Sequence, residues 1–192
     1  MSLENKKNKL FFRLFKYTAL APLLLFLPIA NNPNSLKAGV EFQWDSNKNF
    51  KKLKWFQTEE RKNFRNKIYL FLRSSDRKTG LLKISLKVPD RFAPQIKKEK
   101  ISLCEVRVGG FSSKTKCLKS IPTEIEIDKD NNKVDIFPSS PIPSNKKNIA
   151  IRLKVSNPKR GGLYQFHGFG QSSGKVPVSY YLGSWTLITD SQ

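Results

Sequence analysis

The chain has 192 residues, of which 36 are Lys or Arg and 15 are Asp or Glu, so its formal net charge at pH 7 is +21. A single histidine cannot build a zinc site, and the only methionine is the first residue, which removes thioether copper ligands; we therefore predict no metal and no cofactor. A basic chain suggests polyanionic partners such as nucleic acid, phosphorylated lipids or acidic glycans. The excess of Lys over Arg, 27 to 9, together with 14 Asn, is also what an A/T-rich genome imposes, whereas bidentate phosphate recognition favours Arg. The charge thus has two explanations, a functional one and a compositional one.

Residues 1–38 have the layout of a secretory signal peptide. Basic residues between Lys6 and Lys16 precede an uncharged, mostly apolar run from Tyr17 to Ala30, and Ala38 offers a small residue at a cleavage point. The alternative is an uncleaved membrane anchor over residues 10–30. A spanning helix needs about 20 apolar residues, and this run is shorter and contains two prolines. We therefore expect export to the periplasm or cell envelope.

The exported chain would be residues 39–192, with a net charge of +16 and the size of one domain with a core. We expect an irregular basic segment over 39–66, in which 40–44 alternates like a short strand and 58–60 weakly indicates the start of a helix. The β-sandwich domain is expected over 67–192. Nucleic-acid binding is disfavoured by the export signal.

From residue 67 onward the apolar residues recur with a period of two, which predicts β-strands. Residues 90–100 are expected to hold one helical turn, and almost no helical periodicity occurs elsewhere. About nine or ten short strands separated by turn residues predict an all-β fold, an antiparallel β-sandwich that is Ig-like or related, with minor helical turns. The clearest strands are expected at 67–72, 82–88, 101–108, 124–128, 134–137, 149–155, 162–169 and 185–189.

Cys104 and Cys117 lie 13 residues apart on either side of two glycines, a spacing that suits neighbouring strands joined by a loop. Because disulfides persist in oxidising compartments, we predict a structural disulfide, with free buried thiols as the alternative. Cys104 shares a face with Val106 and is expected to point inward. No histidine or further cysteine lies close enough in sequence to suggest a metal ligand.

The stretch from Asn157 to Phe166 is predicted to be a hairpin turn. Pro158 is preset for the second position of a turn, and Gly161 can take the left-handed conformation that closes it. The alternative, functional interpretation is that this turn forms an anion-binding concavity, made by Lys159, Arg160 and the backbone amides of Gly161 and Gly162.

Catalytic motifs are missing from the sequence: it contains no nucleophile elbow, no Ser-His-Asp arrangement in a credible context and no phosphate loop. The single histidine, His167, is expected at a partly exposed polar position. Glycoside hydrolysis needs only two carboxylates, so a hydrolase remains an alternative. Its candidate residues are Glu59, Glu60, Glu124, Glu126 and Asp128.

The C-terminal part of the chain carries a distinctive set of motifs. These are residues 157–166 (NPKRGGLYQF), Gly174 followed by Pro177, residues 181–185 (YLGSW), and the proline-rich approach at 141–143. In these motifs the chain resembles a cyanobacterial family of exported proteins catalogued as a domain of unknown function. The resemblance implies an exported, β-rich protein and supplies no catalytic residues.

Together these observations predict a non-catalytic, envelope-associated β-sandwich with a binding or structural role. Its ligand would be an anionic envelope component, either a lipid phosphate or an acidic glycan, contacted by Lys159 and Arg160. Membrane contact is expected only through an uncleaved N-terminal segment or through surface charge. A glycan or peptidoglycan hydrolase is the first alternative. A periplasmic metal-handling module is the second, and the shortage of His and Met disfavours it.

Overall fold

A computed structural model describes residues 51–144, 147–173 and 176–190, all within the compact unit Gly39–Gln192. The predicted signal peptide or anchor and the strand expected at 40–44 lie outside these residues. Among the described residues, no helix is long and apolar enough to cross a membrane. The strands are β1 (Trp55–Gln57), β2 (Arg65–Leu72), β3 (Leu81–Lys87), β4 (Ile101–Arg107), β5 (Lys116–Ile121), β6 (Thr123–Asp128), β7 (Lys133–Pro138), β8 (Ile149–Ser156), β9 (Gly162–Ser172) and β10 (Ser179–Thr189).

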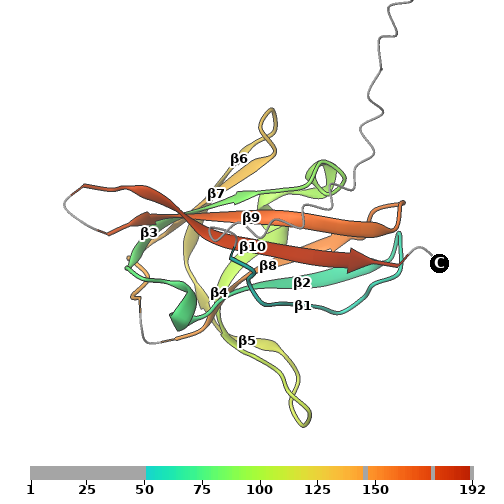
Figure 1. The fold of residues 1–192 in the computed structure, drawn as a ribbon, viewed down its shortest axis with the longest axis horizontal. Coiled ribbons are helices and arrows are strands. Elements are labelled where there is room, and N and C mark those ends of the chain that lie inside the picture. The colour runs from blue at the N-terminus through green and yellow to red at the C-terminus, as the bar shows by residue number, and fades with distance from the viewer. Residues whose placement is uncertain (1–50, 145–146, 174–175, 191–192) are drawn as a thin grey trace, which may run out of the picture. The chain divides into compact units, whose positions relative to one another are not determined.

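The strands form two five-stranded antiparallel sheets, so the fold is the predicted all-β sandwich (Figure 1). Sheet 1 has the order β1-β2-β8-β4-β5, and sheet 2 has the order β10-β9-β3-β7-β6. Three short 3-10 turns complete the described structure: η1 (Ser74–Asp76), η2 (Ala93–Gln95) and η3 (Lys98–Lys100). Two of them lie in the segment 90–100, where a helical turn was expected.

The core lies between the two sheets because one side chain in two along each strand points inward. In β3, Ile84 and Leu86 are fully buried, and in β8 Ile151 and Leu153 meet them from the opposite sheet within one hydrophobic cluster. Trp185 of β10 lies fully buried in the same cluster. This alternation is the pattern by which the sequence predicted the strands.

The two sheets are joined along both sides. On one side β5 leads directly into β6 through Pro122, so the chain passes from the edge of sheet 1 to the edge of sheet 2. On the other side, the segment before β1 bonds to β10: the Leu53 amide donates to Ser184 O (2.7 Å), and the Ser184 amide donates to Lys51 O (2.8 Å). A Cβ at Gly183, whose φ is +141°, would lie 2.6 Å from Lys51 O. Glycine therefore permits this close approach.

Three local expectations differ from the structure. The segment 39–66 contributes to the sandwich, since 55–57 forms β1 and β2 begins at Arg65. Residues 58–60 form no helix, because the Asn66 side chain accepts the Thr58 and Glu59 amides (3.1 and 3.2 Å) and holds a turn instead. The last strand begins at Ser179 and not at the expected residue 185, and it continues through a bulge at Gly183.

The orientation of Cys104 is also corrected. It is buried, but alternation along β4 places it opposite Leu103, which belongs to the central core. Its register partner is Ala150, and Ala150 belongs with Val106 to a second, small cluster on the outer face of sheet 1. The two cysteines lie at disulfide-bonding distance, with 1.98 Å between the Sγ atoms.

Candidate functional site

A recess of about 390 Å³ lies on the outer face of sheet 2. The outward-facing residues of four neighbouring strands line it, since the alternate residues of the same strands fill the core. Figure 1 shows these strands side by side, with β3 between β7 and β9. Its lining residues are Lys83, Ser85 and Lys87 of β3, Lys133 of β7, His167 and Phe169 of β9, and Ser179 of β10. Every charged residue in this lining is a lysine.

Asp135 neutralises part of this positive charge. Its carboxylate accepts hydrogen bonds from Ser85 Oγ (2.5 Å) and Lys133 Nζ (2.9 Å), and Lys83 Nζ lies 3.6 Å away. Partial burial by itself raises the pKa of Asp135, but the hydrogen bonds from Ser85 and Lys133 and the lysine charges outweigh it, so the pKa is lowered. Lys87 donates to the Asn131 backbone carbonyl and has no carboxylate partner in the described structure. The recess therefore keeps an excess of positive charge.

His167, one of the lining residues, contacts a pair of hydroxyl groups behind it. His167 Nδ1 lies 2.6 Å from Ser184 Oγ, and the Tyr181 hydroxyl lies 2.5 Å from the same oxygen. Burial, followed by the nearby Lys87 charge, lowers the pKa of His167. A neutral imidazole is therefore the favoured form at neutral pH.

The contact between Ser184 and His167 is not a nucleophile-base pair. Ser184 has no exposed surface, so a substrate carbonyl cannot reach its hydroxyl. The bulge at Gly183 turns Ser184 toward His167, its register partner on β9. Sequence reasoning expected His167 at a partly exposed polar position, where the structure has it, but missed Ser184, because only the strand register brings Ser184 to the histidine.

An exposed aromatic ring forms one wall of the recess. Phe169 is 37% exposed, and its ring lies 5.7 Å from that of Tyr181, measured between centroids. The wall offers apolar surface beside the cationic side chains. This combination suits a ligand that has both a flat apolar face and negative charge.

The predicted anion site lies in the turn between β8 and β9. Lys159 and Arg160 are exposed, and neither side chain makes a hydrogen bond or ion pair with the described residues. The left-handed conformation falls on Gly162, with φ of +145°, and not on Gly161 as expected. The Tyr164 hydroxyl donates to Arg160 O (2.6 Å), which ties the start of β9 to this turn.

Sequence reasoning missed one further cation near this turn, Arg91. Burial raises the pKa of the Tyr164 hydroxyl, while the nearby charges of Arg91 and Arg160 oppose the increase. Arg91 directly precedes Phe92, whose ring packs edge-on against Tyr164 with 5.2 Å between centroids. No sequence signal links the two arginines, because Arg91 follows β3 and Arg160 precedes β9.

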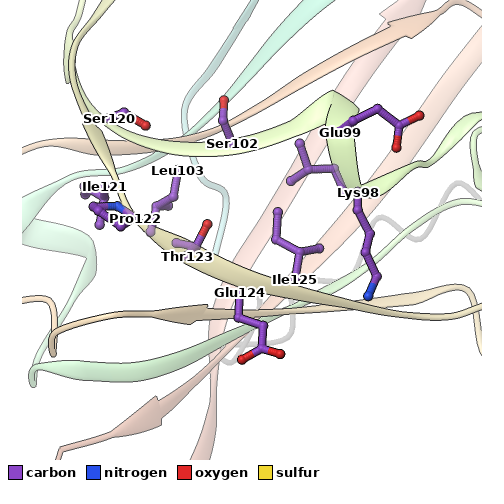
Figure 2. Close-up of a pocket in the computed structure, with 11 residues that line it drawn as sticks. Lys98, Glu99, Ser102, Leu103, Ser120, Ile121, Pro122, Thr123, Glu124 and Ile125 are labelled. Carbon is purple, nitrogen blue, oxygen red and sulfur yellow. The ribbon is translucent and has the colours of Figure 1, made fainter.

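A second recess, of about 540 Å³, lies where β5 passes into β6 (Figure 2). Glu99 and Glu124 are the acidic residues in its lining, and their carboxylates do not point toward one another (Figure 2). Retaining and inverting glycosidases place two carboxyl groups on either side of one bond, about 5–9.5 Å apart. This geometry offers no such pair.

The carboxylates named for the hydrolase alternative lie in two parts of the chain, after β1 and along β6. Glu124, Glu126 and Asp128 alternate along the exposed face of β6. Glu59 pairs with Arg61 at 2.7 Å, and hydrogen bonds from Arg61 lower the pKa of Glu59 to about 2. Glu60 donates its amide to Glu59 Oε1 (3.0 Å). Within the described ranges, no group of three or more His, Cys, Asp or Glu residues is arranged to hold a metal ion.

Comparison with known proteins finds similar folds among solved structures. The chain is similar to BslA, a bacterial hydrophobin, at 12% identity and a TM-score of 0.48, over 74% of this chain and 97% of that one. It is similar to the collagen-binding domain of a Staphylococcus aureus adhesin at 14% identity and a TM-score of 0.38, over 70% and 95% of the two chains. It is also similar to the RrgA Jo.In complex at 6% identity and a TM-score of 0.41, over 71% of this chain and 78% of that one.

A search of curated proteins finds no significant match. A family model does match, over residues 42–188, which is most of the chain. The chain therefore belongs to the family described as "Protein of unknown function (DUF2808)".

Proposed function

We propose that this protein is an exported, non-catalytic β-sandwich that binds an acidic glycan of the cell envelope in the recess on the outer face of sheet 2. The observation that carries the proposal is the lining of that recess. Its charged residues are all lysines, and they line the recess together with an exposed phenylalanine ring.

The charge of the recess favours an anionic ligand. Lys83 and Lys133 share one carboxylate, that of Asp135, and Lys87 has only a backbone carbonyl as partner. A bound carboxylate or sulfate group would complete the neutralisation. Lysines act here as point charges, which suits a ligand whose negative groups are spaced along a polymer.

The aromatic wall favours a glycan among anionic ligands. The apolar face of a sugar ring can pack on Phe169, which removes apolar surface from water on both partners. The hydroxyl groups of Ser85 and Ser179 also line the recess and can exchange hydrogen bonds with sugar hydroxyls.

Two features support location in the envelope of a cyanobacterial cell. Residues 1–38 have the layout of a signal peptide, and the cysteine pair lies at disulfide-bonding distance, which suits an oxidising compartment. The C-terminal motifs resemble those of exported cyanobacterial proteins, which supports the origin.

The test is binding to polygalacturonate, a simple acidic polysaccharide, with neutral dextran as the comparison. We expect wild-type protein to bind polygalacturonate in a salt-sensitive manner. Lys87→Glu places a negative charge in the recess and should weaken binding roughly tenfold, since an attraction of up to about 1 kcal/mol becomes a repulsion of similar size.

The matched control is Lys154→Glu, which makes the same change of charge at an exposed position of β8, in the other sheet. It should bind nearly as wild type does. Lys159→Ala/Arg160→Ala tests the predicted turn as the site for the same class of ligand. Loss of binding in that double variant, with Lys87→Glu unaffected, would move the site to the turn. Equal binding by all variants would reject both sites.

A further inference from the structure

The β4–β5 hairpin extends away from the two sheets and ends in an ordered loop (Figure 1). Two contacts shape the loop. The Gly110 amide donates to Ser113 O (3.0 Å), and the Gly109 amide donates to Thr115 Oγ1 (3.0 Å). The cysteine pair joins Cys104 of β4 to Cys117 of β5 at the base of the hairpin. The tip is therefore held in a defined position relative to the sandwich.

The loop presents Phe111 to solvent with no burial at all. Its side chain is fully exposed, at 112% of the reference value. Leu118, at 59%, and Val108, at 41%, are exposed on the same hairpin. A phenylalanine ring left wholly in water gains free energy on entering an apolar environment, so the tip favours an apolar partner surface.

The same hairpin is strongly basic. Residues 107–119 contain four basic residues and no acidic residue. Among the described residues, none of these four side chains makes a hydrogen bond or an ion pair. The term hairpin tip denotes Phe111 with Arg107, Lys114 and Lys116 beside the loop, together with Lys119, which lies two positions beyond Cys117 as the register partner of Glu105.

We propose that the hairpin tip docks on the surface of an anionic lipid bilayer, with the Phe111 ring in the headgroup region and the four basic side chains on lipid phosphates. This site is separate from the recess and does not depend on the glycan proposal. Aromatic rings are favoured at the membrane interface, where Lys and Arg stems lie along apolar surface and their charged ends reach the phosphates.

The shape and charge of the tip select a bilayer over a protein partner. A projecting loop with one apolar ring needs a surface that yields around it, and a bilayer interface does so without a preformed pocket. Four unpaired cations complement a negatively charged leaflet. Each contributes about fivefold in affinity for such a surface at physiological salt, so the four together bias the tip toward anionic lipid.

The experiment places a reporter at the tip of the full chain. Phe111→Trp keeps an aromatic ring there, and its emission is compared with that of wild-type protein, which carries the same three native tryptophans. Vesicles of phosphatidylglycerol and phosphatidylcholine should shift the emission of the variant to shorter wavelength. Vesicles of phosphatidylcholine alone should produce at least tenfold weaker binding. Quenching by lipids brominated in their acyl chains reports how deep the ring lies.

The basic residues are tested in the same background. Lys114→Glu/Lys116→Glu/Lys119→Glu should abolish the shift with anionic vesicles, and Lys154→Glu, which changes one exposed charge elsewhere, should retain it. Phe111→Ser should lower vesicle affinity, whereas Val178→Ser, at an apolar residue 57% exposed beside β10, should not. Unchanged thermal unfolding of each variant shows that it has folded.

Three results would overturn the proposal. The emission at position 111 could stay unshifted while the protein sediments with vesicles, which would assign membrane binding to another part of the chain. The shift could be equal on neutral vesicles, which would reject the role of the basic residues. A shift in concentrated protein without lipid would identify a second copy of the chain as the partner. Lys87→Glu should leave the vesicle response intact. Failure of the glycan proposal can therefore be told apart from failure of the membrane proposal.

Discussion

Asn66 Nδ2 donates to Asn157 Oδ1 at 2.8 Å, and both side chains are 2% exposed. The pair joins β2 to the turn after β8, two segments distant in sequence. Asn157 Nδ2 in turn donates to the backbone carbonyls of Glu59 (3.0 Å) and Arg61 (2.8 Å). Asn157 therefore anchors the turn between β1 and β2, which is a structural role for the first residue of the C-terminal motif.

Asn157→Ala should destabilise the fold by about 3 kcal/mol. It removes three hydrogen bonds and leaves buried partners unsatisfied, at about 1–3 kcal/mol for each such group that water cannot reach. The free energy of unfolding in urea measures the effect. Asn148→Ala, at an exposed asparagine before β8, is the control and should change stability by less than about 0.5 kcal/mol. Equal effects of the two substitutions would contradict the anchoring role.

Trp185→Phe should cost about 3 kcal/mol of stability. The Trp185 indole N–H crosses from sheet 2 to sheet 1 and donates to Phe71 O at 3.0 Å, with the ring fully buried. Phenylalanine leaves that carbonyl without its donor and creates a small cavity. Thermal unfolding followed by near-UV circular dichroism measures the loss. Trp55→Phe, at a partly buried edge position, is the control and should cost less than about 1 kcal/mol. Equal losses in the two variants would argue against a contribution from the inter-sheet bond.

The lowered pKa of His167 predicts that the free energy of unfolding decreases on mild acidification. Its pKa in the folded state is lowered from the ordinary value of 6.5, so between these two values the unfolded chain binds more protons. Stability is therefore full above about pH 6.5 and declines as the pH falls toward the folded pKa. The lowered pKa values of Glu59, Asp128 and Asp135 act at lower pH, since carboxylates titrate near pH 4.

The measurement is urea unfolding of wild type and His167→Asn at pH 7.5 and 5.5. Wild type should lose more stability across this interval than the variant does, because asparagine does not titrate. Parallel losses in the two proteins would show that the imidazole is not responsible.

Removal of the cysteine pair by Cys104→Ala/Cys117→Ala should lower stability by about 3 kcal/mol. A bridge closing a loop of this length restricts the unfolded chain by roughly that amount, and the sequence separation is 13. The wild-type protein in reducing agent provides the comparison and should show a similar shift of the unfolding midpoint. A wild-type midpoint indifferent to reducing agent would mean that the bridge contributes nothing to stability.

Much of the fold could be predicted because strand formation depends on local pattern. The alternation in Leu82–Val88 and Ile149–Val155 predicts β3 and β8 to within about a residue, since burial of one face selects every second side chain. The short edge strand β1 was missed. Its pairing with β2 and the bonds of Leu53 to β10 come from neighbours far away in sequence, and three residues are too few for a periodicity.

The candidate site was harder to predict than the fold. Three lysines of the recess, Lys83, Lys87 and Lys133, are four and forty-six positions apart along the chain. The alternation of the strands predicts that each faces solvent, but no sequence pattern predicts that they lie together. The exposed turn with Lys159 and Arg160 was visible as a motif, because Pro and Gly mark turns by their own backbone preferences. Its closing residue was misplaced by one position, since two adjacent glycines can both adopt a positive φ and local preference does not choose between Gly161 and Gly162.

The sequence by itself determined where most of the strands lie and, for most of them, which face is buried, and it favoured pairing of Cys104 with Cys117 over free thiols. These follow from short-range periodicity, turn chemistry and the compartment suggested by the N-terminus. Only the tertiary structure decided that Lys83, Lys87 and Lys133 line one recess, that Ser184 contacts His167, and that Phe111 stands at an exposed tip. The physical reason is that strand order and register bring together residues that local preferences leave independent. The motif at Asn157 combines both contributions: its turn is encoded locally, and its anchoring role arises from the contact with Asn66.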